Sequence, residues 1–337
     1  MALAHVEETQ TIDTGRPHIQ DKKLPILTIE WGKTSVAEWQ RLLARVPRSN
    51  VIQTFAYAQA VRSAKQQMTR FGVIRENGAP VGLVQIQEVK LFGVFHTVVL
   101  DRGPLWFAEN VTPDYWEAFF RTFDGEFPRR IGRWRRIMPE LDETEENLKM
   151  LISSGLRVVR SGYRSIWLDL RDDTEQIRKR FKGKWRNALN AAEKSGLDVA
   201  VDWQMETLPW LLMQYEADKK ERGYDGPSAS FLHCLTHAAR GSGNVIVLRA
   251  MKRDRPVAAI MILRHGSSAT YQIGWTNEEG RDAKSHHLLL WRACLALKDI
   301  GVEWFDAGGI NEEHAEGVTR FKRGLGGREY KLVGTFS

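Results

Sequence analysis

The chain has 337 residues, of which 42% are hydrophobic and 27% charged, and this balance is typical of a globular protein long enough for two domains. Its 49 basic and 42 acidic residues give a net charge of +7, a moderate bias towards polyanions that falls short of a dedicated nucleic-acid binder. No run of about 18 apolar residues is present, which excludes a membrane-spanning helix.

Residues 1–23 are polar, lack periodicity and carry no secretory-signal pattern, so we expect a disordered tail. Cys234 and Cys294 each sit in a helical pattern with apolar neighbours, and neither has metal-ligand spacing. Two such cysteines favour a reduced compartment. We therefore expect a cytoplasmic protein without a metal.

A first domain is predicted over 24–160 from its order of strand and helix patterns. The expected elements are a strand at 26–31, helices at 36–46 and after Gln53, a meander of three or four strands at 70–100, a helix at 113–123, a strand at 129–138 and a helix at 144–153. Five arginines surround Trp134 in the last strand. We expect Ile131, Trp134 or Ile137 to point inward and the arginines outward; contact of the arginines with nucleic-acid bases or phosphates is the alternative.

A second domain, predicted over 161–337, repeats this plan. It opens with a strand at 165–170 and a long amphipathic helix at 172–196. One stripe of that helix is expected to be buried, and it consists of Ile177, Phe181, Trp185, Leu189 and Ala192. Lys182, Lys184 and Arg186 lie off the stripe, where they either contact nucleic acid or form a solvated face. A helix at 205–220, strands at 244–251, 257–264 and 269–275, and a helix at 285–300 follow.

The closing stretch, residues 304–327, carries the strongest functional signal. A strand ends at Asp306 before Gly308 and Gly309, and a short basic helix at 317–323 contains Lys322 and stops at Gly324. A final strand is expected at 329–336. Loops with little side chain next to one lysine suit a site where backbone N–H groups and an ammonium approach a developing negative charge.

Several of these motifs resemble those of the FemABX family, the peptidoglycan-bridge aminoacyltransferases, and of related proteins with a GNAT-like fold. The likeness rests on D-A-G-G-I followed by R-F-K-R-G-L-G-G, on W-R-N-A-L-N-A-A-E-K-S-G in the long helix, and on R-G-P after the meander. It spans about residues 35 to 336. The resemblance implies an α/β (α+β) protein of two tandem GNAT-like domains, with mixed sheets flanked by helices and the substrate cleft near their junction.

The resemblance also assigns residues. Lys322 is the candidate that stabilises the oxyanion, with Phe321 packed beside it, and the resemblance implies that Arg62 and Arg222 hold phosphates of the acceptor or donor. For Arg62, an exposed arginine at a helix end is the favoured alternative. The other substrate-binding residues that the resemblance implies are Tyr57, Arg102, Asp306, Gly308 and Gly309. Family members often carry an aspartate shortly after R-G-P, whereas this chain has L-W-F there, and Asp101 before the motif is not its equivalent. This departure leaves the general base and the acceptor open.

The expected reaction is N-acyl transfer, in which an amine attacks an activated carbonyl. The favoured donor is aminoacyl-tRNA and the acceptor an amine of a phosphate-bearing cell-envelope precursor. Acyl-CoA is the alternative donor, but the pyrophosphate loop [RQ]-x-x-G-x-[GA] is replaced by T-N-E-E-G-R-D-A-K-S-H-H. A non-catalytic protein that binds RNA or a polymer is the third reading. No cofactor is expected, and peripheral contact with the inner membrane surface is among the expected partners.

Overall fold

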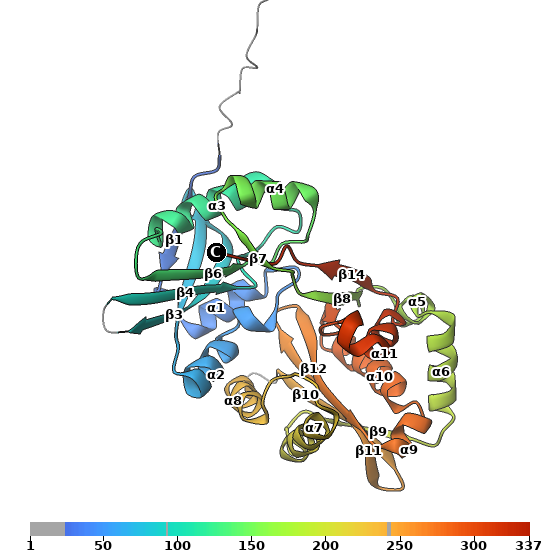
Figure 1. Ribbon diagram of the computed structural model, residues 1–337. Helices are drawn as coiled ribbons and strands as arrows, with labels where there is room; N and C mark the ends of the chain where they lie inside the picture. Colours follow the sequence, from blue (N-terminus) through green and yellow to red (C-terminus); the bar gives the residue numbers. More distant parts are fainter. Residues whose placement is uncertain (1–23, 92–93, 241–243) are drawn as a thin grey trace, which may run out of the picture.

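The computed structural model describes residues 24–91, 94–240 and 244–337, and its two mixed sheets are each flanked by helices (Figure 1). This arrangement confirms the predicted fold class. The tail predicted for residues 1–23 lies outside the described residues. Among the described residues, no helix is long and apolar enough to cross a membrane.

The first sheet has eight strands in the order β1-β2-β3-β4-β6-β15-β7, with β5 paired to β3. Its strands are β1 (Leu27–Trp31), β2 (Met68–Glu76), β3 (Ala79–Leu91), β4 (Phe95–Asp101), β5 (Leu105–Trp106), β6 (Arg133–Met138), β7 (Val158–Arg160) and β15 (Thr335–Phe336). The helices of this unit are α1 (Val36–Leu43), η1 (Val51–Gln53), α2 (Phe55–Lys65), α3 (Pro113–Glu126) and α4 (Glu145–Ser153). An aromatic-rich core fills the space between the sheet and α3.

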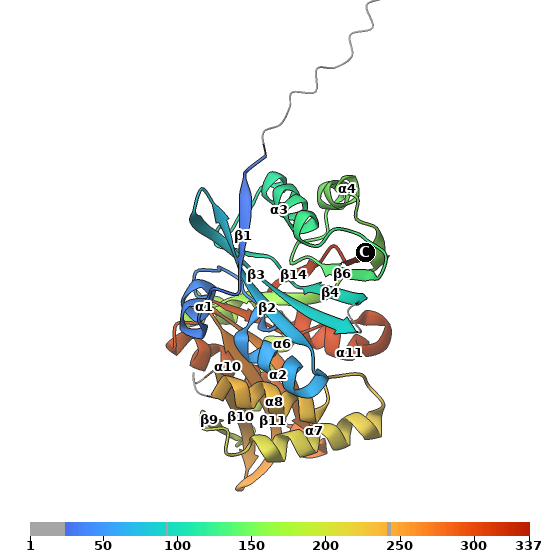
Figure 2. The ribbon, with the colours of Figure 1, turned by 90° about the vertical axis from the view of Figure 1, so that its left-hand side faces the viewer.

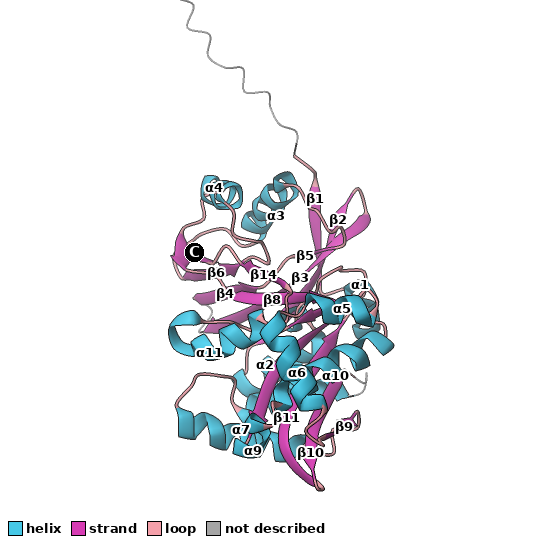
Figure 3. Ribbon diagram, turned by 90° about the vertical axis from the view of Figure 1, so that its right-hand side faces the viewer, coloured by secondary structure: helices cyan, strands magenta, loops and turns pink. Residues whose placement is uncertain are grey.

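The second sheet has seven strands in the order β14-β8-β13-β12-β11-β10-β9. Its strands are β8 (Arg164–Asp169), β9 (Asp198–Asp202), β10 (Val245–Lys252), β11 (Arg255–His265), β12 (Ser268–Thr276), β13 (Trp304–Asp306) and β14 (Arg328–Lys331). Its helices are α5 (Thr174–Arg180), α6 (Gly183–Glu193), α7 (Leu208–Arg222), α8 (Ala229–Ala239), α9 (Glu278–Asp282), α10 (Ser285–Asp299) and α11 (Glu312–Arg323). One face of the sheet packs on α6 and α10 and the other on α7 and α8 (Figure 3).

The two sheets repeat one topology, and the end of the chain supplies one strand to the first sheet. Four antiparallel strands, β1 to β4 or β9 to β12, are followed by a parallel neighbour, β6 or β13. The next position is taken by β15, from the end of the chain, in the first sheet and by β8 in the second. An edge strand, β7 or β14, completes each sheet. The two units are therefore bound together through shared backbone hydrogen bonds.

Two segment predictions need correction. The final strand predicted at 329–336 is two strands in different sheets, because the chain leaves β14 and turns at Gly334, where φ is +112°. The long helix predicted at 172–196 breaks between α5 and α6. At the break, Lys182 N–H donates to the carbonyl of Gly324 at 2.8 Å instead of continuing the helix. All five residues of the predicted stripe are nevertheless buried.

The orientation predicted for β6 is wrong for two of its three apolar residues. Ile137 is buried, but Trp134 and the preceding Ile131 are exposed and Arg135 points into the core. The burial of Arg135 is tolerated because its guanidinium pairs with Asp124 and donates a hydrogen bond to the carbonyl of Phe127 at 3.2 Å. This ion pair determines which face of β6 is buried.

Helices α2 and α8 pack against each other where the two units meet (Figure 2). Apolar residues of α2 and η1 join the core that α7 and α8 form with the second sheet. The helix pair holds the units side by side and leaves a cavity between them.

Candidate active site

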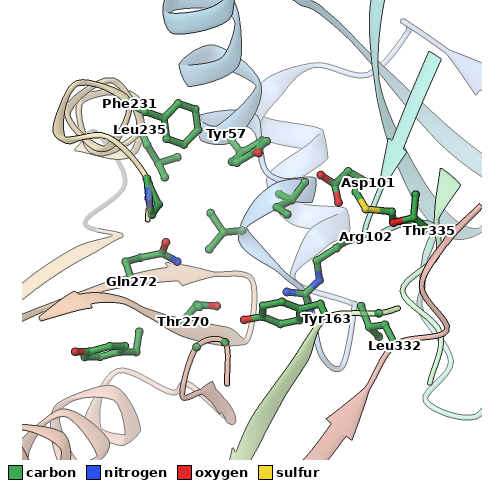
Figure 4. A pocket seen from close by; sticks show the side chains of 18 of the residues that line it. Tyr57, Asp101, Arg102, Tyr163, Phe231, Leu235, Thr270, Gln272, Leu332 and Thr335 are labelled. Carbon is green, nitrogen blue, oxygen red and sulfur yellow. The ribbon is translucent and has the colours of Figure 1, made fainter. Parts of the chain in front are cut away.

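The candidate site is a cavity of about 660 Å³ between the two units (Figure 4). Tyr57 and Asp101 lie on one side of the cavity, and Thr270 and Gln272 of β12 lie on the other. Helix α8 adds apolar side chains, and the loop after β13 adds backbone only. Because both units supply walls, the cavity depends on their assembly.

The loop after β13 is fastened by the buried carboxylate of Asp306. One oxygen accepts from Gly308 N–H at 2.8 Å and from the Ser165 hydroxyl, and the other accepts from the Tyr330 hydroxyl at 3.0 Å. Gly308 has φ of +76°, and a Cβ there would lie 2.7 Å from the carbonyl oxygen of Tyr271. Only glycine fits this close approach. Asp306 thus holds the backbone of the glycine loop that forms this part of the cavity wall.

Lys322 lies directly behind this wall. Its side chain is buried, and its ammonium donates to the carbonyl of Gly309 at 2.8 Å and lies 5.3 Å from the centre of the Tyr271 ring. Burial lowers the pKa of Lys322 to about 8, although the nearby Asp306 carboxylate opposes this shift. Gly309 and Tyr271 both line the cavity, so the ammonium contacts the outer side of the cavity wall.

A buried polar network links this wall to the first unit. The Arg102 guanidinium makes two hydrogen bonds of 2.7 Å to Glu140 and donates to the Tyr330 hydroxyl at 3.0 Å. It also lies 4.6 Å from the centre of the Tyr163 ring. Arg102 lines the cavity, and through Tyr330 it reaches Asp306. The R-G-P arginine therefore joins the two units at the site.

Asp101, the last residue of β4, was not predicted as a site residue. Burial raises the pKa of Asp101 to about 6, although the positive charges of Arg136 and Arg102 oppose this shift. A carboxyl group with such a pKa in a cavity has the properties of a general base near neutral pH. The signal in the sequence was the alternation of β4, which buries Val98 and Leu100 on one face and leaves Asp101 on the other.

Residues 178–332 match the model of a family described as the acetyltransferase (GNAT) domain. The second unit therefore carries a region similar to a GNAT acetyltransferase domain. A search of the curated proteins gives no match.

Solved structures share the fold at low sequence identity. FemX is 14% identical, with a TM-score of 0.75 over 91% of this chain and 96% of FemX. A conserved protein of unknown function from Bacteroides thetaiotaomicron is 9% identical, with a TM-score of 0.59 over 92% of this chain and 98% of its own. The C-terminal domain (DUF2156) of a protein described as a lysylphosphatidylglycerol synthetase from Agrobacterium fabrum is 14% identical, with a TM-score of 0.51 over 90% and 92%.

The segment between β12 and α10 of the GNAT domain is acidic and closely packed. It forms α9, whose first turn carries Glu278 and Glu279. A Cβ at Gly280 would lie 2.3 Å from the carbonyl oxygen of Val257, so this glycine serves packing. Lys284, before α10, provides no side-chain cap. Glu279 is paired with Lys252 at 3.1 Å, whereas Glu278 adds a negative charge that opposes the binding of a pyrophosphate.

Other predicted site residues lie away from the cavity walls. Phe321 packs against Trp185 and against the two adjacent histidines of α10, and so fixes the orientation of α11. Arg62 is exposed near the end of α2, and Arg222 pairs with Asp218 at 2.8 Å at the end of α7. Lys65, one turn beyond Arg62, lines the cavity instead.

The predicted nucleic-acid residues lie on the opposite face of the second sheet from α8. Lys182 and Lys184 are exposed at the start of α6. Arg186 donates to the carbonyls of Lys179 and Phe181, both at 2.7 Å, and so bridges the break between α5 and α6. Contact of these three residues with RNA stays a prediction.

Helix α8, which supplies the apolar wall of the cavity, was indicated only by the helical pattern around Cys234 and was given no bounds or role. Its start is marked by Ser228, whose hydroxyl accepts from Phe231 N–H at 3.2 Å. Leu232 and Leu235 follow at helical spacing and line the cavity together with Phe231. Tyr57 of α2 packs edge-to-face on Phe231, with ring centres 5.6 Å apart.

Among the described residues, no three potential metal ligands gather in one place.

Proposed function

We propose that the protein transfers an aminoacyl group from aminoacyl-tRNA to an amine of a phosphate-bearing cell-envelope precursor in the cytoplasm. The observation that carries this proposal is the cavity between the two units, which has Asp101 on one wall and the buried Lys322 ammonium behind another. A carboxyl with a raised pKa suits a general base that accepts the proton of the acceptor amine, and an ammonium with a lowered pKa suits stabilisation of the oxyanion.

The reaction follows from these two groups. The acceptor amine forms a bond to the ester carbonyl carbon, and the Asp101 carboxylate takes the proton that the nitrogen loses. The negative charge that develops on the carbonyl oxygen is stabilised by Lys322 across the glycine loop. When the C–O bond to the tRNA ribose breaks, protonated Asp101 returns the proton to the departing hydroxyl. No covalent enzyme intermediate is needed.

Electrostatics near α9 favours aminoacyl-tRNA over acyl-CoA as the donor. Glu278 and Glu279 stand where a GNAT-type acyl-CoA site, as described above, would present N–H groups to a pyrophosphate. The family description names an acetyltransferase, which keeps acyl-CoA as the second candidate donor. The third reading, a non-catalytic protein that binds RNA or a polymer, leaves the shifted pKa values of Asp101 and Lys322 without a role.

The acceptor phosphate is assigned to the cationic side of the cavity. Lys65 lines the cavity, and its ammonium lies 5.4 Å from the centre of the Phe231 ring. Arg102 lines the same cavity, although its guanidinium is engaged by Glu140. Lys65 is therefore the cation that we assign to the phosphate.

The donor is tested by calorimetry with a charged tRNA mixture and with acetyl-CoA under identical conditions. We expect measurable binding of charged tRNA and no saturation by acetyl-CoA. Reversal of Glu278 and Glu279 to lysine should improve acetyl-CoA binding if these carboxylates repel the pyrophosphate. Binding of acetyl-CoA by the wild-type protein with a low-micromolar dissociation constant, without binding of charged tRNA, would make acyl-CoA the donor.

A further inference from the structure

One end of the first sheet exposes apolar side chains beside basic ones. Val94 and Phe95 at the start of β4 are 63% and 54% exposed, Trp134 of β6 is 73% exposed, and Ile131 is fully exposed. Lys90, Arg129, Arg130 and Arg136 are also exposed. We call these eight residues the apolar–basic end.

The backbone brings these residues together. β4 and β6 are parallel neighbours, with Thr97 opposite Trp134. The turn before β6 lies against the start of β4, because His96 N–H donates to the carbonyl of Gly132 at 2.8 Å. A Cβ on Gly132 would lie 2.6 Å from the carbonyl oxygen of Val94. Ile131, beside Gly132, therefore stands next to Val94 and Phe95.

The carboxylates near the apolar–basic end are either paired with a neighbouring side chain or lie at the margin of this surface. Glu88 of β3 is buried and bonded to His96 at 2.8 Å. Asp124 is paired with the inward Arg135. Glu126, the last residue of α3, is exposed at the margin. Residues 129–138 contain five arginines and no acid, so the exposed surface is positive.

We propose that the apolar–basic end docks the protein onto an anionic lipid bilayer. The exposed aliphatic side chains of Val94 and Ile131 can enter the boundary between headgroups and acyl chains, and tryptophan favours that boundary. Lysine and arginine around them contact anionic headgroups. An RNA partner would use the cations and Trp134, but it would leave Ile131 and Val94 without a role.

Docking here would also direct the cavity towards lipid-linked molecules. Trp134, Arg136 and Met138 alternate onto one face of β6, and Met138 lines the cavity. At roughly 3.3 Å per residue, Trp134 lies about 13 Å along the strand from Met138. The positive charge of Arg136 acts on both Asp101 and Tyr57 in the cavity. Only this statement about substrate access rests on the proposed function; the docking itself does not.

The test is sedimentation of the full chain with vesicles of phosphatidylcholine alone or of equimolar phosphatidylglycerol and phosphatidylcholine. We expect binding only to the anionic vesicles, weakened by salt. The double variant Val94→Ser/Ile131→Ser should lower the partition constant at least about tenfold. The double variant Lys90→Gln/Arg130→Gln should lower it by a similar factor and reduce the salt dependence. Melting curves should stay unchanged, because all four side chains are exposed.

Met213→Ser is the matched control, because Met213 is 61% exposed on α7 in the other unit. It should bind vesicles like the wild-type protein. Wild-type protein that stays in the supernatant with anionic vesicles would overturn the proposal, as would apolar variants that match the control. If the basic variant instead loses tRNA binding while vesicle binding persists, the surface is a nucleic-acid site and the proposal fails. Since no donor is present, the result is separate from that of the transfer assay.

Discussion

At the scale of single residues, burial at the cavity shifts the pKa values of two side chains towards neutral pH, one upward and one downward. Burial disfavours the charged form of each group, so the pKa of Asp101 rises to about 6 and that of Lys322 falls to about 8. Between these values both groups are charged in the folded protein. This is the state in which a base accepts a proton and an ammonium stabilises an oxyanion.

The two pKa values predict a bell-shaped pH dependence of transfer. The rate should rise with pH through about 6, as Asp101 becomes ionised, and fall above about 8, as Lys322 loses its proton. Asp101→Asn should remove the acidic limb and lower the rate about 10²–10⁴-fold. Single-turnover rates measured across this range check both limbs. An acidic limb that persists in Asp101→Asn would assign it to another group.

From the sequence, the residues that the second unit contributes to the candidate site could be predicted better than those of the first unit. The motif at 304–327 indicated Lys322, Gly308 and Gly309 correctly as neighbours, since they lie in one continuous segment. Asp101 could not be recognised in the same way, because its pKa depends on burial between two units that are far apart in the chain. Tertiary packing also explains why Lys65, and not the predicted Arg62, lines the cavity. The packing of α2 on α8 decides which turn of α2 reaches the cavity.

At the scale of elements, the connection from α11 to β14 is fitted into the break between α5 and α6. Gly326 has φ of +68°, and a Cβ there would lie 1.9 Å from the carbonyl oxygen of Arg180. Lys182 N–H bonds to Gly324 at the same place. The helix carrying Lys322 is therefore positioned by the segment that starts the second unit.

Gly326→Ala should destabilise the protein by more than about 1 kcal/mol, through backbone strain and collision with Arg180. Gly317→Ala is the control in the same helix, because its added methyl group meets no atom within 4 Å. That change should stabilise the protein by about 0.5–1 kcal/mol. Chemical denaturation measures both effects. Equal stabilities of the two variants would show that the connection is not tightly fitted.

The sequence predicted most elements but not those set by tertiary contacts. The apolar stripe keeps its spacing from Ile177 through Phe181 to Trp185, so periodicity alone shows no break in the helix. Alternation likewise runs through 329–336, although its two ends belong to different sheets. In β6, burial of Arg135 depends on Asp124 of α3, which no pattern within the strand reveals.

At the scale of the whole molecule, the insertion of β15 into the first sheet makes the first unit depend on the end of the chain. Phe336 of β15 is fully buried in the core of the first unit, although it is the penultimate residue of the chain. β8 begins the second half of the chain and pairs with both β13 and β14. The two units that form the cavity walls are held together by the insertion of β15 and by the network around Arg102.

Phe336→Ala should cost about 3–5 kcal/mol of unfolding free energy. Because β15 of the second half completes the first sheet, we expect one cooperative transition reported by probes in both units. Val318→Ala, at a half-exposed position of α11, should stay within about 0.5 kcal/mol of the wild-type protein. A cost below about 1 kcal/mol for Phe336→Ala would contradict the role of β15 in the first core.

The central claim is that acyl transfer takes place in the cavity between the units, with Lys322 stabilising the oxyanion. The most direct test is single-turnover transfer of a labelled amino acid from charged tRNA to amine-bearing envelope precursors, with wild-type protein and Lys322→Met. Lys220→Met, at an exposed position of α7, serves as the control. We predict that Lys322→Met keeps its circular dichroism and melting curve and loses about 10²–10³ in rate. A folded Lys322→Met protein with the wild-type rate would contradict the claim.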